Sequence, residues 1–162
     1  MRDNLGPMRL AELQKRTILI LGFGAEGQAT FTFLRKQWPG KMLSIADRRT
    51  REEFPREMIR ELEQDSALTL KLGPDYLDSL ATGLCDVIIK TPGIPASIDP
   101  IAKAIETGSA VTSHSAIFLS NYPRQKIIGI TGTKGKSTTA SLIWHILNAA
   151  GLPAELVGTS QC

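Results

Sequence analysis

The stretch Thr17-Ile-Leu-Ile-Leu-Gly-Phe-Gly-Ala-Glu-Gly27 decides the fold of this chain. It begins with a short, continuous apolar run, which is typical of a strand buried in a parallel sheet. It ends in the spacing Gly22-x-Gly24-x-x-Gly27, and a helical spacing of apolar side chains follows over Gln28–Gln37. A strand, a glycine-rich turn and a helix in this order predict the first unit of a doubly wound α/β domain.

Strands and helices keep alternating as far as about Ser120. The sequence predicts further strands at Met42–Ala46, Leu68–Leu72, Asp86–Lys90 and Ala110–Thr112, and helices or helical turns at Thr50–Gln64, Pro74–Leu80, Pro100–Thr107 and Ser113–Leu119. This alternation predicts an α/β, Rossmann-like, parallel sheet with right-handed crossovers. We expect this domain to occupy residues 1–124, because the polar, proline-bearing segment Asn121–Gln125 breaks the pattern.

A second α/β domain is predicted to start at residue 125. We expect a strand at Lys126–Thr131, a helix at Ser137–Ala150 and the beginning of another strand at Ala154–Val157. One strand, one helix and a strand stub cannot bury a sheet by themselves. The segment 125–162 is therefore expected to be the truncated start of that domain.

Between this strand and helix lies Gly129-Ile-Thr-Gly-Thr-Lys-Gly-Lys-Ser-Thr138. Its glycines let successive backbone N–H groups turn inward, and the helix start adds a positive dipole end, so the segment predicts a loop for a nucleoside triphosphate. Lys136 would reach the β- and γ-phosphates, and the Ser137 hydroxyl would ligate Mg²⁺. The strict phosphate-loop spacing requires glycine where this chain has Ile130, so a glycine-rich turn without a ligand is the alternative.

The first glycine motif also has more than one interpretation. Asp47 ends the second predicted strand, 47 − 27 = 20 positions after Gly27, which matches the dinucleotide fingerprint. An NAD(P)-binding oxidoreductase or regulatory domain, a site for another nucleotide, and a turn without a ligand all fit this spacing. The segment Thr91–Pro95 follows the fourth predicted strand; ligands of open α/β sheets bind at such ends, although proline and glycine also simply end strands.

Composition excludes several classes of protein. Hydrophobic residues make up 42% and charged residues 22% of 162 residues, with a net charge of +3, and neither a nucleic-acid surface nor a membrane span is indicated. Two cysteines, Cys85 and Cys162, form neither a disulfide framework nor a metal site. We expect a reduced, cytoplasmic protein in which His114 and His145 have structural roles.

Three stretches together resemble the Mur ligases of peptidoglycan synthesis: Ile18–Gly27, Ile88–Ile94 and Ile128–Thr138. The offset glycines of the third stretch are the normal form in that family, and the likeness extends from about Thr17 to Val157. The combination favours the members that add D-glutamate.

The resemblance implies three domains, which bind a UDP-linked substrate, ATP with Mg²⁺, and the incoming amino acid. It implies that a monomeric ligase joins D-glutamate to UDP-N-acetylmuramoyl-L-alanine through an acyl phosphate. By position, the UDP-substrate site would contain Gly24, Ala25, Glu26, Asp47, Arg48, Arg49, Thr91 and Gly93. The ATP and Mg²⁺ site would contain Gly132, Thr133, Lys134, Gly135, Lys136, Ser137 and Thr138, with Lys136 catalytic and Ser137 the metal ligand. Because the rest of the second domain and the whole third domain are missing, we expect this chain alone to be inactive.

Overall fold

The computed structural model describes residues 8–81, 85–95, 97–123 and 126–157. The chain divides into two compact units, Met1–Arg124 and Gln125–Cys162. The assignment of the first unit to a UDP-linked substrate and of the second to ATP remains a prediction.

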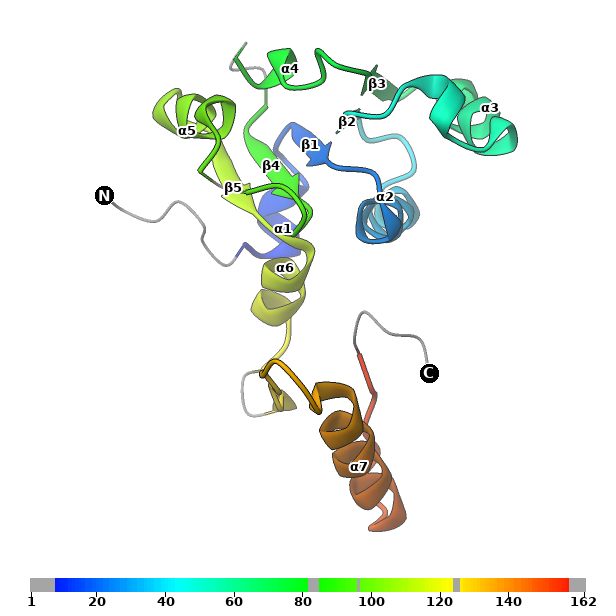
Figure 1. The fold of residues 1–162 in the computed structure, drawn as a ribbon, viewed down its shortest axis with the longest axis vertical. Coiled ribbons are helices and arrows are strands. Elements are labelled where there is room, and N and C mark those ends of the chain that lie inside the picture. Colours follow the sequence, from blue (N-terminus) through cyan, green and yellow to red (C-terminus); the bar gives the residue numbers. More distant parts are fainter. Residues whose placement is uncertain (1–7, 82–84, 96, 124–125, 158–162) are drawn as a thin grey trace. The chain divides into compact units, whose positions relative to one another are not determined.

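The first unit is built on a five-stranded parallel sheet with the order β3-β2-β1-β4-β5 (Figure 1). The strands are β1 Ile18–Leu21, β2 Leu43–Asp47, β3 Leu68–Leu72, β4 Val87–Lys90 and β5 Ala110–Thr112. In the central strand, Ile20 lies opposite Ile45 of β2 and opposite Ile89 of β4. The predicted Rossmann-like sheet is therefore confirmed. The direction of winding reverses between β1 and β4, and this switch point is where open α/β sheets bind their ligands.

The helices of this unit follow the predicted pattern, except that the short helix Leu10–Leu13 was not predicted and some predicted helices differ in extent. They are α1 Leu10–Leu13, α2 Ala25–Gln37, the 3₁₀ turn η1 Arg51–Glu53, α3 Arg56–Gln64, α4 Asp78–Ala81, α5 Asp99–Glu106 and α6 His114–Asn121. Helix α2 starts earlier than predicted, with Gly24 as its N-cap. The helix predicted over Thr50–Gln64 is split, because proline disfavours helical dihedrals in the residue before it, and Phe54 is extended (φ −103°, ψ 155°) ahead of Pro55.

Two apolar clusters cover the two faces of the sheet. Successive side chains of a strand point to opposite faces, so Ile18 and Ile20 pack with Leu34 of α2 and Leu62 of α3. Leu19 and Leu21 pack on the other face, in a cluster that also contains Leu80, Ile101 and Ala104. All four residues of β1 are buried. This burial on both faces explains why β1 reads as a continuous apolar run and not as an alternating one.

In the described part of the second unit, helix α7 occupies Lys136–Ala149. The strand predicted at Lys126–Thr131 is not formed, so that prediction is wrong. Neither that segment nor Ala154–Val157 forms a strand, since a strand exists only through hydrogen bonds to a neighbouring strand, and these two segments do not pair. No residue of α7 is buried, and Ile146 is 62% exposed. The described part of this unit therefore has no core of its own.

Candidate functional site

The loops that follow β1 and β4 meet at the carboxyl edge of the sheet. A Cβ placed on Gly22 would lie 2.3 Å from Thr91 Oγ1, and the Thr91 N–H donates to Leu21 O at 3.0 Å. Gly24 and Gly93 are exposed, and a Cβ on either would meet no atom within 4 Å. The structure thus brings the two predicted substrate-binding loops together at the switch point and leaves their outer glycines open.

The three glycines of the first loop have different structural roles. Gly22 adopts φ +91°, a left-handed conformation that favours glycine. Gly27 lies so near β1 that a Cβ would come within 2.1 Å of Gly22 O, so helix α2 can approach the strand only with glycine here. Gly24, with φ −71°, needs no special residue. Ala25 is exposed and Glu26 half-buried in the first turn of α2.

Asp47, at the end of β2, is buried and bonded to the glycine loop. Its Oδ2 accepts the Phe23 N–H at 2.5 Å, and its Oδ1 accepts the Arg49 N–H at 2.9 Å. Arg49 also donates from Nε to Asp47 Oδ1 at 3.0 Å and from Nη2 to Phe23 O at 2.8 Å. Arg48, between them, is exposed and belongs to none of the ion pairs of the described residues.

The loop after β3 is attached to the same segment. The Gly73 N–H donates both to Asp47 O at 3.1 Å and to Arg49 O at 2.9 Å. The Arg49 guanidinium lies over the Phe54 ring at 4.1 Å from its centroid, a geometry in which a cation is attracted to the ring. The loops after β1, β2 and β3 are therefore held together through Asp47 and Arg49.

His114 also stands at this edge, as the first residue of α6 after β5. Its Nδ1 lies 2.9 Å from Thr30 Oγ1, and Thr30 Oγ1 donates its single proton to Glu26 O at 2.8 Å. While the Thr30 hydroxyl donates to Glu26 O, it can only accept from His114, which requires the tautomer with a proton on Nδ1. This contact joins α6 to α2 and gives His114 the structural role predicted for it.

In the second unit, the loop before α7 is open to solvent. Gly132 (φ +148°) and Gly135 (φ +77°) adopt conformations that favour glycine, and the residues from Thr131 to Thr139 are all exposed. The Lys136 ammonium donates to the carbonyl of Gly132, four residues earlier. The predicted ATP residues, Gly132, Thr133, Lys134, Gly135, Lys136, Ser137 and Thr138, thus form one continuous loop and helix start, but their ligand remains a prediction.

No protein-family model matches the chain, but individual relatives do. It is 32% identical over 146 residues to the UDP-N-acetylmuramoyl-L-alanine–L-glutamate ligase of a Micromonospora species, which is 90% of this chain and 31% of that enzyme. It is 32% identical over 139 residues to the UDP-N-acetylmuramoylalanine–D-glutamate ligase of Clostridium acetobutylicum, which is 86% of this chain and 29% of the relative. The UDP-N-acetylmuramoylalanine–D-glutamate ligase of Clostridium kluyveri is 33% identical over 143 residues, which is 88% of this chain and 30% of that enzyme. This chain is a distant homologue of the Mur ligases.

The Mur ligase homology confirms the resemblance predicted from the three glycine-containing stretches. The chain spans only about 30% of the length of these curated relatives. Sequence reasoning placed Asp47 and Arg49 at the site, but it missed that they bond to Phe23 and to each other. No residue-type signal reveals such bonds, because they depend on how the ends of β1 and β2 meet.

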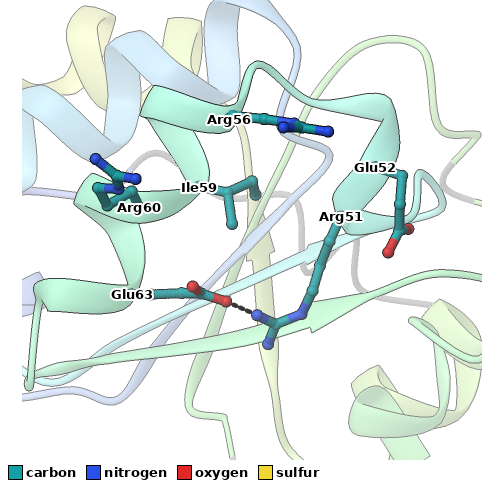
Figure 2. Close-up of a pocket in the computed structure, with 6 residues that line it drawn as sticks. All are labelled: Arg51, Glu52, Arg56, Ile59, Arg60 and Glu63. Carbon is teal, nitrogen blue, oxygen red and sulfur yellow. Dashed lines mark ion pairs between the residues drawn. The ribbon is translucent and has the colours of Figure 1, made fainter.

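Among the described residues of this Mur ligase homologue, a hollow in the first unit is a candidate for a competing site. This hollow, of about 340 Å³, lies over η1 and α3, where Arg51 is paired with Glu63 (Figure 2). Its lining mixes three arginines with two glutamates and includes none of the predicted site residues, so we assign it no ligand. Within the described ranges, no helix is long and apolar enough to cross a bilayer, and no three His, Cys, Asp or Glu residues are grouped as metal ligands.

Lowering the pH is expected to destabilise the first unit through two aspartates. Burial raises the pKa of Asp47, but hydrogen bonds from Arg49 and Phe23 outweigh it, so this pKa lies below its ordinary value. Hydrogen bonds from the Thr17 backbone and side chain lower the pKa of Asp86. A carboxyl whose pKa is lower in the folded state stabilises the protein above its unfolded pKa of about 3.9 and loses that contribution as the pH falls through the folded value.

The measurement is the midpoint of thermal unfolding (Tm) between about pH 6 and pH 2. We expect the Tm to be level above about pH 5 and to fall below about pH 4. The double variant Asp47→Asn, Asp86→Asn should have a lower Tm at neutral pH and a shallower fall. A wild-type Tm that stayed constant or rose in acid would contradict the assignment.

Proposed function

We propose that this chain carries the UDP-substrate-binding domain and the start of the ATP-binding domain of a ligase that joins glutamate to UDP-N-acetylmuramoyl-L-alanine in the cytoplasm. The observation that supports this most is the similarity to glutamate ligases over 86% to 90% of the chain. Because neither unit alone is that long, the similarity extends over parts of both units. The open glycine loop at the switch point supports it independently, since a helix start at such a place favours phosphate. The residues proposed to form the UDP-substrate site are Gly24, Ala25, Glu26, Arg48, Thr91 and Gly93, with Asp47 and Arg49 beside them.

The proposed chemistry is the formation of an amide in two steps. The substrate carboxylate oxygen attacks the γ-phosphorus of ATP, forming an acyl phosphate and releasing ADP. The amine of glutamate then attacks the acyl carbon, the amide bond forms, and phosphate leaves with the bonding electrons. The Lys136 ammonium would stabilise negative charge on the phosphoryl group during the first step.

The loop before α7 fits a triphosphate and its metal ion. Its glycines hold left-handed conformations, and its residues are exposed to an approaching ligand. Lys136 and Thr138 at the helix start would contact phosphate oxygens, and the Ser137 hydroxyl would ligate Mg²⁺. Bound Mg²⁺ would supply neutralising charge. To bind phosphate, the Lys136 ammonium must exchange its present acceptor, Gly132 O, for a phosphate oxygen.

The amino acid is the least constrained part of the proposal. D-glutamate follows from the combination of sequence motifs. L-glutamate is the second candidate, because relatives named as L-glutamate ligases match with comparable identity, 32% against 32% to 33%. Both candidates share the UDP-linked substrate, so both predict the same site in the first unit.

An NAD(P) site is the alternative that the first motif leaves open. In a dinucleotide site, the acid at the end of the second strand accepts a hydrogen bond from a ribose hydroxyl. Here the Asp47 carboxylate is buried and already accepts hydrogen bonds from Phe23 and Arg49. A ribose would have to displace them, which favours the UDP-linked substrate over NAD(P).

Calorimetric titration of the 162-residue chain tests the proposal. We expect heat of binding with UDP-N-acetylmuramoyl-L-alanine and none with NAD at the same concentration. We also expect no phosphate release from ATP when the UDP-linked substrate and glutamate are added to this chain alone. Binding of NAD without any response to the UDP-linked substrate would overturn the proposal in favour of a dinucleotide domain.

A further inference from the structure

We propose that Asp47 and Arg49 are positioning residues, which hold the Phe23 peptide so that the amides opening α2 face the ligand, and that neither side chain is itself a ligand contact. The binding part of this inference rests on the proposed function, because the ligand is the UDP-linked substrate proposed above. The inference gives different roles to Asp47, Arg48 and Arg49, the three neighbouring residues that were assigned to the site from the sequence. Only Arg48 retains a side chain that is free to contact an anion.

The hydrogen-bonding capacity of the Asp47 carboxylate is fully used within the protein. A carboxylate offers about four lone-pair positions. Oδ1 accepts from the Arg49 N–H and Nε, and Oδ2 accepts from the Phe23 N–H and from Arg49 Nη2 at 3.2 Å. The residue is 7% exposed. A ligand hydroxyl could bond to this carboxylate only by replacing one of these four donors.

The guanidinium of Arg49 is restrained from two directions. Its edge donates to Asp47 and to Phe23 O, and its face lies over the Phe54 ring. The fork geometry of arginine suits such paired contacts, which a lysine ammonium cannot reproduce. Arg49 is therefore part of the support of the loop, although it is only half-buried.

Both polar groups of Phe23 are held by this pair. Asp47 accepts its N–H, and Arg49 donates to its carbonyl. The Phe23 ring packs against Phe31 and Phe54, with ring centroids 6.1 Å and 6.2 Å apart. The next residue, Gly24, is the N-cap of α2, so fixing Phe23 fixes the direction of the unpaired amides in the first helical turn. Groups fixed in advance bind an anion without a further ordering cost.

The decisive variant is Asp47→Asn, which keeps the shape but replaces two acceptor positions with an NH₂ group. We expect the Phe23 amide to exchange with solvent at least about tenfold faster, and the affinity for ligand to fall about ten- to a hundredfold, the usual range for residues that orient binding groups. Arg49→Lys should produce the same pair of changes, so it tests the inference if Asp47→Asn fails to fold.

Two probes, UDP and inorganic diphosphate, separate positioning from direct contact. If Asp47 only positions the loop amides, Asp47→Asn should weaken both probes by a similar factor. If Asp47 touched the ribose or the uracil, only UDP would bind more weakly. The measurements are calorimetric affinities of the full chain together with amide exchange by nuclear magnetic resonance.

Asp86→Asn is the matched control. The Asp86 carboxylate also accepts a backbone N–H, from Thr17 at 2.7 Å, and the Thr17 hydroxyl at 2.8 Å, but it lies at the amino ends of β1 and β4. This variant should lower the Tm while leaving the Phe23 amide exchange and both affinities unchanged. Arg48→Ala should weaken both probes without changing the Phe23 amide exchange.

Three outcomes would overturn the inference: Phe23 exchange that stays at the wild-type rate in both Asp47→Asn and Arg49→Lys, unchanged affinities in these variants, or a loss confined to UDP. If the wild-type chain binds neither probe, the proposed function fails, and the inferred hold on Phe23 is still decided by the exchange rates.

Discussion

Replacing Gly27 with alanine is expected to destabilise the chain by roughly 2–4 kcal/mol. The added Cβ would come within 2.1 Å of the Gly22 carbonyl oxygen, which is backbone and cannot rotate away. Helix α2 would therefore have to move off β1. Without this contact, alanine would stabilise the helix by about 1 kcal/mol relative to glycine. The predicted loss of stability therefore depends only on the contact with the Gly22 carbonyl oxygen.

Urea denaturation of the wild-type chain and the variant measures this loss. Gly24→Ala is the matched control, because a Cβ there meets no atom within 4 Å and φ is −71°. It should change the free energy of unfolding by no more than about 1 kcal/mol, the usual size of an N-cap effect. A Gly27→Ala variant as stable as the wild type would show that α2 is not packed against β1 as described.

Replacing Lys136 with alanine is expected to lower ligase turnover by roughly a hundred- to a thousandfold, the range found when a group that stabilises transition-state charge is removed. The assay needs the remaining domains, so we suggest a hybrid in which this chain replaces the corresponding part of the Clostridium acetobutylicum relative. Turnover is measured as glutamate-dependent phosphate release. The affinity for the UDP-linked substrate, which is proposed to bind the first unit, should be nearly unchanged.

His145→Ala in the same hybrid is the control for Lys136. His145 lies on the same helix, α7, and is exposed, but it is outside the phosphate loop. Its removal should leave turnover close to that of the unmodified hybrid. Near-normal turnover of Lys136→Ala would contradict the proposed role of the loop.

Most of the first unit could be predicted because local and tertiary requirements agree there. The run Ile18–Leu21 is apolar at every position, which suits a strand covered on both faces, and the structure covers both. The break in the helix at Pro55 could also have been predicted from the sequence, because proline restricts the backbone of the residue before it through local contacts.

The strand predicted at Lys126–Thr131 shows where such reasoning fails. The segment is apolar enough for a strand, but its ladder hydrogen bonds require a neighbour that the described part of the second unit does not supply. The large apolar side chains Ile128, Ile146 and Val157 are accordingly more than 60% exposed. Strand propensity is therefore a poor predictor wherever the pairing partner is missing.

The chain's own residues were sufficient to identify the class of fold, the family and the position of the glycine loops, because these depend on periodicity and on short motifs whose glycines have local reasons. The different roles of the Asp47, Arg48 and Arg49 side chains could be seen only in the tertiary structure. In the sequence they are three consecutive charges near 47–49. In the fold, the ends of β1 and β2 bring Phe23 against Asp47 and turn two of the three side chains inward, which leaves Arg48 exposed. The Phe23–Asp47 and Phe23–Arg49 hydrogen bonds join residues that are 24 and 26 positions apart in the sequence. They depend on how the strands are placed, and no local pattern encodes that placement.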